Sequence, residues 1–197
     1  ALGKVGPAAV EPMLKLLVHP SRDVRNTARA ALANMRTPGA IPGVVALIQD
    51  PNTPGRVALV ALLGTVKSQE AFEALRAFVV DDPDHMIREA AVKVLSQRAD
   101  EPARELLRMV AQNDANKEVR HLAVQAMMWL GDRDAMPLLV KMLGFEKDFI
   151  RKAAAMAIGY LGRPEDIPAL IEAMSTPRSE ILTAVRQAAN RVTVTLD

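Results

Sequence analysis

Few side chains in this sequence are of a type and spacing that could carry out catalysis or bind a metal. The three histidines are His19, His85 and His121, and none is followed by the glutamate of an H-E-x-x-H zinc motif. The chain has no cysteine, so it holds neither a thiolate zinc site nor a disulfide framework. It also lacks a G-x-G-x-x-G loop, a P-loop and a G-x-S-x-G nucleophile motif. We therefore expect no catalytic residue, no metal ion and no cofactor.

The side chains best suited to contact a partner are the only tryptophan and the only tyrosine, Trp129 and Tyr160. These residue types are enriched among the few that dominate the energy of protein interfaces, and methionine adapts to irregular surfaces. Helical spacing places further residues beside them, and together they form a candidate partner-binding patch: His121, Gln125, Met128, Trp129, Lys152, Met156 and Tyr160. A competing interpretation is that both aromatic side chains only cover the seam between packed helices.

The composition predicts closely packed helices. Half of the 197 residues are apolar but only 3% are aromatic, so the core consists of Ala, Leu, Val, Ile and Met, whereas a sheet would favour β-branched and aromatic residues. No apolar run reaches the roughly 18 to 20 residues that span a bilayer. The 25 basic and 23 acidic residues nearly cancel, which is weak support for a polyanionic partner.

The helices that must position these side chains are indicated by a repeat of about 31 residues. An arginine returns at steps of 31 or 32 residues, at Arg25, Arg56, Arg88, Arg120 and Arg151, with Leu182 in the sixth slot. Small or apolar residues follow each slot at offsets 3, 7 and 10, with Arg98 as the one misfit. These offsets share one helical face, so each slot opens an amphipathic helix, the second helix of its repeat.

A first helix precedes each second helix. Four of the six first helices carry a proline in the first turn, where a missing N–H leaves no hydrogen bond unmade: Pro12, Pro42, Pro137 and Pro168. Ser21, Asp84 and Asn116 are the expected N-caps of second helices. We predict one domain, residues 1–197, with repeats at approximately 7–37, 38–68, 69–98, 99–131, 132–162 and 163–197.

The repeat resembles a HEAT-like repeat of the short phycobilisome-lyase type, which ends approximately V-R-x-x-A-x-x-A-L-G-x-L-G. Its closest copy runs from Ile150-Arg151 to Leu161-Gly162 and is followed by Ile167-Pro168-Ala169-Leu170-Ile171. The resemblance covers essentially the whole chain and implies an all-α fold, a right-handed αα-superhelix (HEAT-like solenoid). It also implies that the repeated arginines tie successive repeats together. Residues 1–6 resemble the tail of an earlier second helix, which indicates a segment of a longer array or multidomain chain.

The exposed stripe of the second helices is expected at offsets 1, 5 and 9 from each slot. It comprises Asn26, Ala30, Asn34, Val57, Ala61, Thr65, Glu89, Lys93, Gln97, His121, Gln125, Trp129, Lys152, Met156, Tyr160, Thr183, Gln187 and Arg191. This stripe is mostly neutral. It therefore lacks the row of Lys and Arg that neutralises phosphates, which argues against a nucleic-acid partner.

In solenoids of this kind the second helices usually line the concave side, where partners dock. We therefore expect a non-enzymatic scaffold for protein–protein interaction that binds a helix or an extended peptide on this face. Two alternatives stay open, a bilin lyase-like subunit, which the family resemblance allows, and a nucleic-acid-binding protein. The His-Glu pairs that hold iron in HEAT-type deoxyhypusine hydroxylases are absent.

Overall fold

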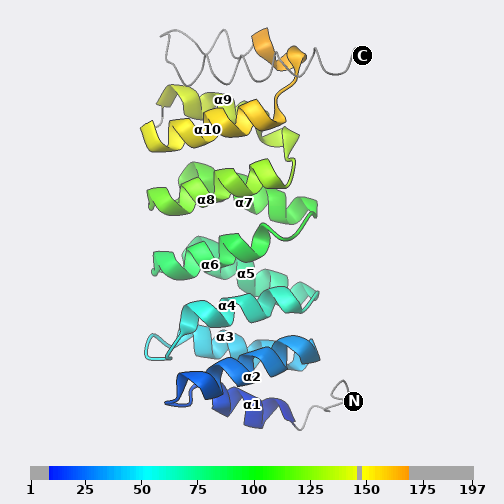
Figure 1. Ribbon diagram of the computed structural model, residues 1–197, viewed down its shortest axis with the longest axis vertical. Coiled ribbons are helices and arrows are strands. Elements are labelled where there is room, and N and C mark those ends of the chain that lie inside the picture. Colours follow the sequence, from blue (N-terminus) through cyan, green and yellow to red (C-terminus); the bar gives the residue numbers. More distant parts are fainter. Residues whose placement is uncertain (1–8, 146–147, 169–197) are drawn as a thin grey trace. The chain divides into compact units, whose positions relative to one another are not determined.

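The computed structural model describes residues 9–145 and 148–168, and all regular structure within these ranges is helical (Figure 1). The α-helices are α1 (Val10–Leu17), α2 (Arg22–Met35), α3 (Ile41–Gln49), α4 (Arg56–Thr65), α5 (Gln69–Asp81), α6 (His85–Leu95), α7 (Glu101–Asn113), α8 (Lys117–Trp129), α9 (Met136–Phe145) and α10 (Asp148–Leu161). Short 3₁₀ turns precede α3 and α9 and follow α10. The predicted all-α class is confirmed. Across the described ranges, no helix is long and apolar enough to cross a membrane.

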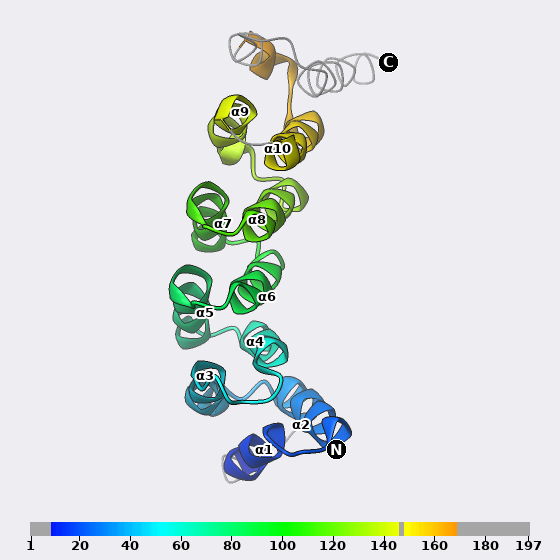
Figure 2. The same cartoon turned by 90° about the vertical axis from the view of Figure 1, so that its left-hand side faces the viewer.

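The chain divides into two compact units, residues 1–95 and 96–197. Within the first unit, α1, α3 and α5 form one layer and α2, α4 and α6 the other (Figure 2). Within the second unit, α7 and α9 form one layer and α8 and α10 the other. Each first helix packs against the second helix that follows it, so the described helices pair into hairpins. The single-domain organisation and the repeat boundaries stay predictions.

Second helices of neighbouring hairpins pack against one another more extensively than the first helices do. This holds for α4 on α6 in the first unit and for α8 on α10 in the second. Small residues permit the close approach: Ala91, Ala123 and Ala154, all at offset 3, are fully buried. In α4, a Cβ added at Gly64 would lie 2.7 Å from Cγ1 of Val94 on α6, so the absence of a side chain lets these helices meet.

The apolar face predicted for the second helices is confirmed. At offset 7, Leu32, Leu63, Leu95, Met127 and Ile158 are all buried. Eleven of the fifteen stripe residues in the first five repeats are exposed, and the other four are half-buried: Thr65, Glu89, His121 and Gln125. The sixth slot, Leu182, and its stripe residues Thr183, Gln187 and Arg191 lie outside the described residues.

The slot arginines close the turn of their own hairpin. In Arg25, Arg88 and Arg120, Nη1 donates to two backbone carbonyls five and six residues earlier, at 2.7 to 3.4 Å. The residue six before the slot shapes the same turn, because its side chain accepts from the backbone N–H two residues on. These acceptors are His19 Nδ1, Asp50 Oδ1, Asp82 Oδ1 and Asp114 Oδ1. The arginines have a structural role, as expected, and in these three the bonds to the turn carbonyls lie within one hairpin.

Arg56 reaches the next hairpin. Its guanidinium lies 3.4 Å from Asp82 and 3.6 Å from Asp84. It also donates from Nε to the carbonyl of Ile48 at 2.5 Å. The difference follows from the turn before α4, which contains Pro54 and a Gly55 with φ +78° and so delays the start of the helix.

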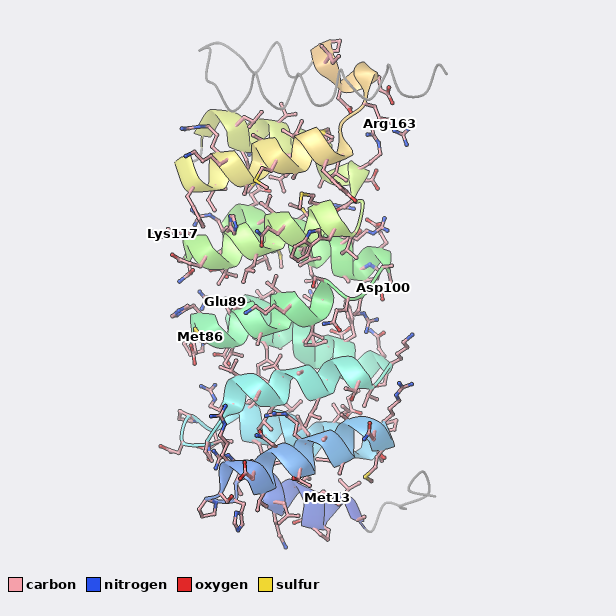
Figure 3. All side chains as sticks on the ribbon, viewed as in Figure 1. Met13, Met86, Glu89, Asp100, Lys117 and Arg163 are labelled. Atoms are coloured by element: carbon pink, nitrogen blue, oxygen red, sulfur yellow. The ribbon has the colours of Figure 1, made fainter. Side chains whose placement is uncertain are left out.

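The prediction that each slot opens its helix is wrong for α2, α6, α8 and α10, which begin three residues earlier. The slot arginine therefore lies at the end of the first turn, from which its side chain reaches back to the hairpin turn. Figure 3 labels Lys117, the first residue of α8, and Met86, the second residue of α6. Only α4 begins at its slot.

Two of the three predicted N-cap residues accept capping hydrogen bonds through their side chains. Asn116 accepts from the backbone N–H groups of Glu118 and Val119 at 2.8 and 3.2 Å. Asp84 accepts from that of Met86 at 2.9 Å. Ser21 is the N-cap residue of α2, as predicted, but its side chain makes no capping bond, and its backbone N–H donates to His19 instead.

Replacing Ala123 or Ala154 with leucine should lower the free energy of unfolding by about 1–3 kcal/mol, because the added methylenes overpack a buried helix contact. Urea denaturation followed by circular dichroism measures the loss. Ala61→Leu, on the exposed face of α4, is the matched control and should change it by no more than about 0.5 kcal/mol. Unchanged midpoints for both buried variants would show that the buried face is misplaced.

Candidate functional site

The most exposed large apolar side chains of the described residues gather on α8 and α10. The exposed fractions are 66% for Trp129, 62% for Met156, 53% for Tyr160 and 46% for Phe149. These two helices pack against each other in the second unit, so the four side chains belong to one surface. Exposed apolar residues are ordinary when scattered singly, but four on two adjoining helices form a patch.

Helical spacing sets each side chain on this surface. On α10, Phe149, Lys152, Met156 and Tyr160 follow one another at i, i+3, i+7 and i+11, which is one face. On α8, His121, Gln125 and Trp129 follow at i, i+4 and i+8, with Met128 beside them. The α8–α10 face is defined by these residues: His121, Gln125, Met128, Trp129, Phe149, Lys152, Met156 and Tyr160.

All seven residues of the predicted patch lie on α8 or α10. Trp129, Lys152, Met156 and Tyr160 are exposed, whereas His121, Gln125 and Met128 are half-buried. Phe149 was not predicted, because the helix was counted from the slot and Phe149 lies two residues before it. Its spacing of three residues from Lys152 is the signal that could have found it.

A stack of two rings joins α8 to α10. The rings of His121 and Phe149 lie with centroids 4.3 Å apart and planes 24° from parallel. His121 is at offset 1 in its repeat and Phe149 at offset −2, so the contact joins residues that are not equivalent in the two repeats.

The backbone after α8 holds Trp129, the last residue of the helix, in place. Gly131 adopts φ +65°. The N–H of Gly131 donates to the carbonyl of Met128 at 3.1 Å, and that of Asp132 donates to the carbonyl of Met127 at 3.0 Å. This pair of bonds is the Schellman ending, which closes the last helical turn.

Arginines from the first-helix layer cap the ends of both helices. Arg104 donates to the carbonyl of Leu130 at 3.5 Å, and Arg133 to that of Leu161 at 2.5 Å. A cation at a helix C-terminus satisfies free carbonyls and interacts favourably with the helix dipole. Trp129 and Tyr160 therefore both lie in final turns that an arginine stabilises.

A buried ion pair anchors the segment that follows α8. The carboxylate of Asp132 is fully buried and accepts from Nε and Nη2 of Arg108 on α7 at 2.8 and 2.9 Å. Arg108 also donates to Glu101 at 2.6 Å. The hydrogen bond to Asp132 is the main cause that raises the pKa of Arg108 above its ordinary value, so the guanidinium stays charged.

His121 is the perturbed titratable group of the α8–α10 face. Its Nδ1 is buried without a hydrogen-bond partner, and burial lowers the pKa of the ring. His19 lies in a hairpin turn and His85 begins α6, so neither belongs to this face. No group of three His, Asp or Glu side chains that could hold a metal ion occurs within residues 9–145 and 148–168.

Comparison with known proteins finds a matching family profile and several similar solved structures. A profile described as HEAT repeats matches residues 41–128 and 110–190. Among curated proteins, none matches this chain. Among solved structures, the chain is similar to a designed armadillo repeat protein in complex with the peptide (KR)4, with 19% identity, a TM-score of 0.53 and coverage of 92% of this chain and 98% of the other.

Two natural proteins are similar at the same level. Human deoxyhypusine hydroxylase shares 18% identity, with a TM-score of 0.52 and coverage of 96% of this chain and 86% of the other. The CpcE–CpcF complex of phycocyanin lyase from Nostoc shares 20% identity, with a TM-score of 0.53 and coverage of 92% and 75%. Identities this low show the fold alone, and that fold, an armadillo- or HEAT-like α-solenoid, is the predicted one.

Arg108→Leu should lower the free energy of unfolding by about 3–5 kcal/mol, because it leaves the buried carboxylate of Asp132 without its partner. Urea denaturation measures the loss. Arg76→Leu is the control: Arg76 is 63% exposed and, among the described residues, pairs with Glu73 of the same helix, so the change should stay within about 0.5 kcal/mol. Equal losses in the two variants would contradict a structural role for the Arg108–Asp132 pair.

Stability should also fall at mildly acidic pH through His121. The pKa of His121 is lowered in the folded chain, so the unfolded chain, with a histidine pKa of about 6.5, takes up the proton first as the pH falls. The contribution is fully present above pH about 7 and declines below about 6.5. Between the two ends of this pH window, the urea midpoint of His121→Gln should change less than that of the unsubstituted chain. Identical pH dependence in both proteins would exclude His121 as the cause.

Proposed function

Since the chain belongs to the HEAT repeat family, we propose that it is a non-enzymatic scaffold that binds another protein or a peptide on the α8–α10 face. HEAT repeats typically mediate protein binding. The observation that carries the proposal is the exposure of Trp129, Met156, Tyr160 and Phe149 on two packed helices. Exposed apolar patches of this kind are more often interaction sites than surface without a binding role.

The exposed fractions favour binding over the interpretation that the aromatic residues only cover a seam. A side chain that fills the seam between two helices loses most of its accessible surface, as Met127 and Ile158 do on the same two helices. Trp129 and Tyr160 keep more than half of theirs, at 66% and 53%. Burying these rings against a partner would stabilise the complex, because it removes from water the apolar surface that packing within the chain leaves exposed.

The similar structures help to narrow the kind of partner. The designed armadillo repeat protein is in complex with a basic peptide. A basic peptide would meet the cation of Lys152 on the α8–α10 face, which argues against transferring that specificity to this chain. The likeness supports only the use of a solenoid surface for peptide binding.

The two alternatives from the sequence gain less support. A bilin lyase-like role rests on the fold that this chain shares with the phycocyanin lyase, and fold alone does not carry function. Nucleic-acid binding needs clustered cations. In the described part of the stripe the cations are Lys93, which pairs with Glu89 at 3.8 Å, and Lys152. A spaced pair of lysines is a poor match for a phosphate backbone.

A Trp129→Ala/Tyr160→Ala variant should lose the partner while keeping its fold. Proteins recovered by the immobilised chain from a lysate of its source should fall about tenfold or more, since tryptophan and tyrosine anchors are each worth about 2 kcal/mol or more when they act as hot spots. Quantitative mass spectrometry of the recovered proteins measures the effect, and circular dichroism checks the fold.

Met109→Ala is the matched control for this experiment. Met109 is an exposed apolar side chain on α7, in the other layer of the same unit, so its loss should leave recovery unchanged. Equal recovery by the double variant and the unsubstituted chain would remove the α8–α10 face as the binding site.

A further inference from the structure

A single unpaired cation lies in the middle of the α8–α10 face. Lys152 is exposed, and its ammonium forms no ion pair with any described residue. Glu118, the nearest acidic residue in the α8 row, lies 3.6 Å from Lys117 and faces that cation instead. The face therefore combines large apolar side chains with one positive charge that pairs with no described side chain.

The order of side chains along the face follows from the stacked His121 and Phe149 rings. That aromatic pair lies at the amino-terminal end of the face. Along α10, Lys152 follows one turn further on and Met156 one turn beyond that. Tyr160 ends the series. The face thus presents apolar, cationic, apolar and apolar groups at successive turns. Because this order is different when read from the other end, it distinguishes the two directions of a bound helix.

We propose, on the basis of the function proposed above, that the α8–α10 face binds an amphipathic helix with apolar side chains at i, i+7 and i+11 and an aspartate or glutamate at i+3 or i+4. A helix laid parallel to α10 has the same rise per residue, so its positions match Phe149, Lys152, Met156 and Tyr160 turn by turn. Two packed helices also present the kind of surface on which a third helix packs at about 8–10 Å.

A second copy of this chain fits the face less well than an acidic helix. In a two-fold contact the same patch meets itself, and Lys152 lies at the middle of the patch. The two ammonium groups would be brought together, and their repulsion disfavours the contact. A carboxylate on the partner instead neutralises Lys152 and fixes the direction of the bound helix.

The apolar anchors provide the affinity and the charge provides the choice of partner. Loss of one exposed ion pair weakens binding by only a few-fold. Replacing that attractive pair with two like charges about doubles the change in binding free energy. We therefore expect exchange of the peptide carboxylate for an amine to weaken binding by about five- to tenfold. Loss of Trp129 and Tyr160 should abolish it.

A helical peptide library on phage tests the proposal. The host is an alanine-rich 16-residue helix with positions i, i+3, i+4, i+7 and i+11 randomised, selected on the immobilised full chain. The peptides recovered should carry apolar residues at i, i+7 and i+11 and Asp or Glu at i+3 or i+4. Affinities of synthetic peptides are then read from the emission of Trp129, the only tryptophan in the chain, which should shift to shorter wavelength on binding.

Charge reversal supplies the decisive comparison. Lys152→Glu should bind the Lys-containing peptide better than the Glu-containing one, whereas Lys141→Glu, the same change at an exposed position of α9, should keep the original preference. Equal affinity for the two peptides, or selection of peptides without an acidic residue, would overturn the acidic-helix inference and leave the proposed function standing. Binding that survives Trp129→Ala/Tyr160→Ala would overturn the proposed function itself; because this variant has no tryptophan, its binding is measured from the anisotropy of a fluorescently labelled peptide.

Three further outcomes also count against the inference. A proline in the centre of the peptide should abolish binding, and undiminished binding would mean that the partner is extended and not helical. Sedimentation that shows a concentration-dependent dimer with the same shift of Trp129 emission would assign the face to a second copy of the chain. Failure to enrich any peptide above the unrandomised host would likewise overturn the inference.

Discussion

Close approach of the second helices is the constraint on which the rest of each unit depends. A hairpin of two short helices cannot bury its apolar surface alone, so its second helix must pack on the second helix of a neighbour. Alanine at offset 3 permits this contact in α6, α8 and α10. In α4 the same offset holds Leu59, and Gly64 provides the missing space against Val94. Because these buried offsets are fixed, offsets 1, 5 and 9 remain on the accessible side, and the α8–α10 face follows from them.

The hairpin turns solve a second physical problem, which is the free carbonyl groups of the turn residues that follow a first helix. Here a slot arginine supplies the donors, and the residue six before it, aspartate in three turns and His19 in the first, accepts from the backbone within the turn. The guanidinium has its donors in a fixed fork, so one side chain serves two carbonyls at once. A lysine could reach the same place but would not hold that geometry. The recurrence of arginine at this slot is thus explained by local backbone chemistry and not by a ligand.

The sequence predicted what is periodic and missed what is particular to one repeat. Burial at offsets 3 and 7 and the pairing of helices follow from a spacing that is visible in the chain. Phe149 precedes its slot, and the delayed start of α4 depends on the conformation of Gly55, so neither repeats. The Arg108–Asp132 pair spans 24 residues and joins α7 to the segment after α8, a contact that helical periodicity cannot indicate. The partner-binding role of the patch remains a proposal that rests on exposure.

The glycine after α8 has a consequence for how variants of this chain should be read. Gly131 contributes no side chain to the α8–α10 face, yet its backbone ends the helix immediately after the tryptophan. A β-branched residue there could not adopt the same φ without strain, and the last turn would unwind and turn the indole away. In saturation mutagenesis with partner binding as the readout, substitutions at position 131 would therefore lower binding as those of a contact residue do. Gly131 itself, however, supplies no side chain to the contact. Tolerance of asparagine, which accepts the left-handed conformation, would separate this conformational role from a true contact.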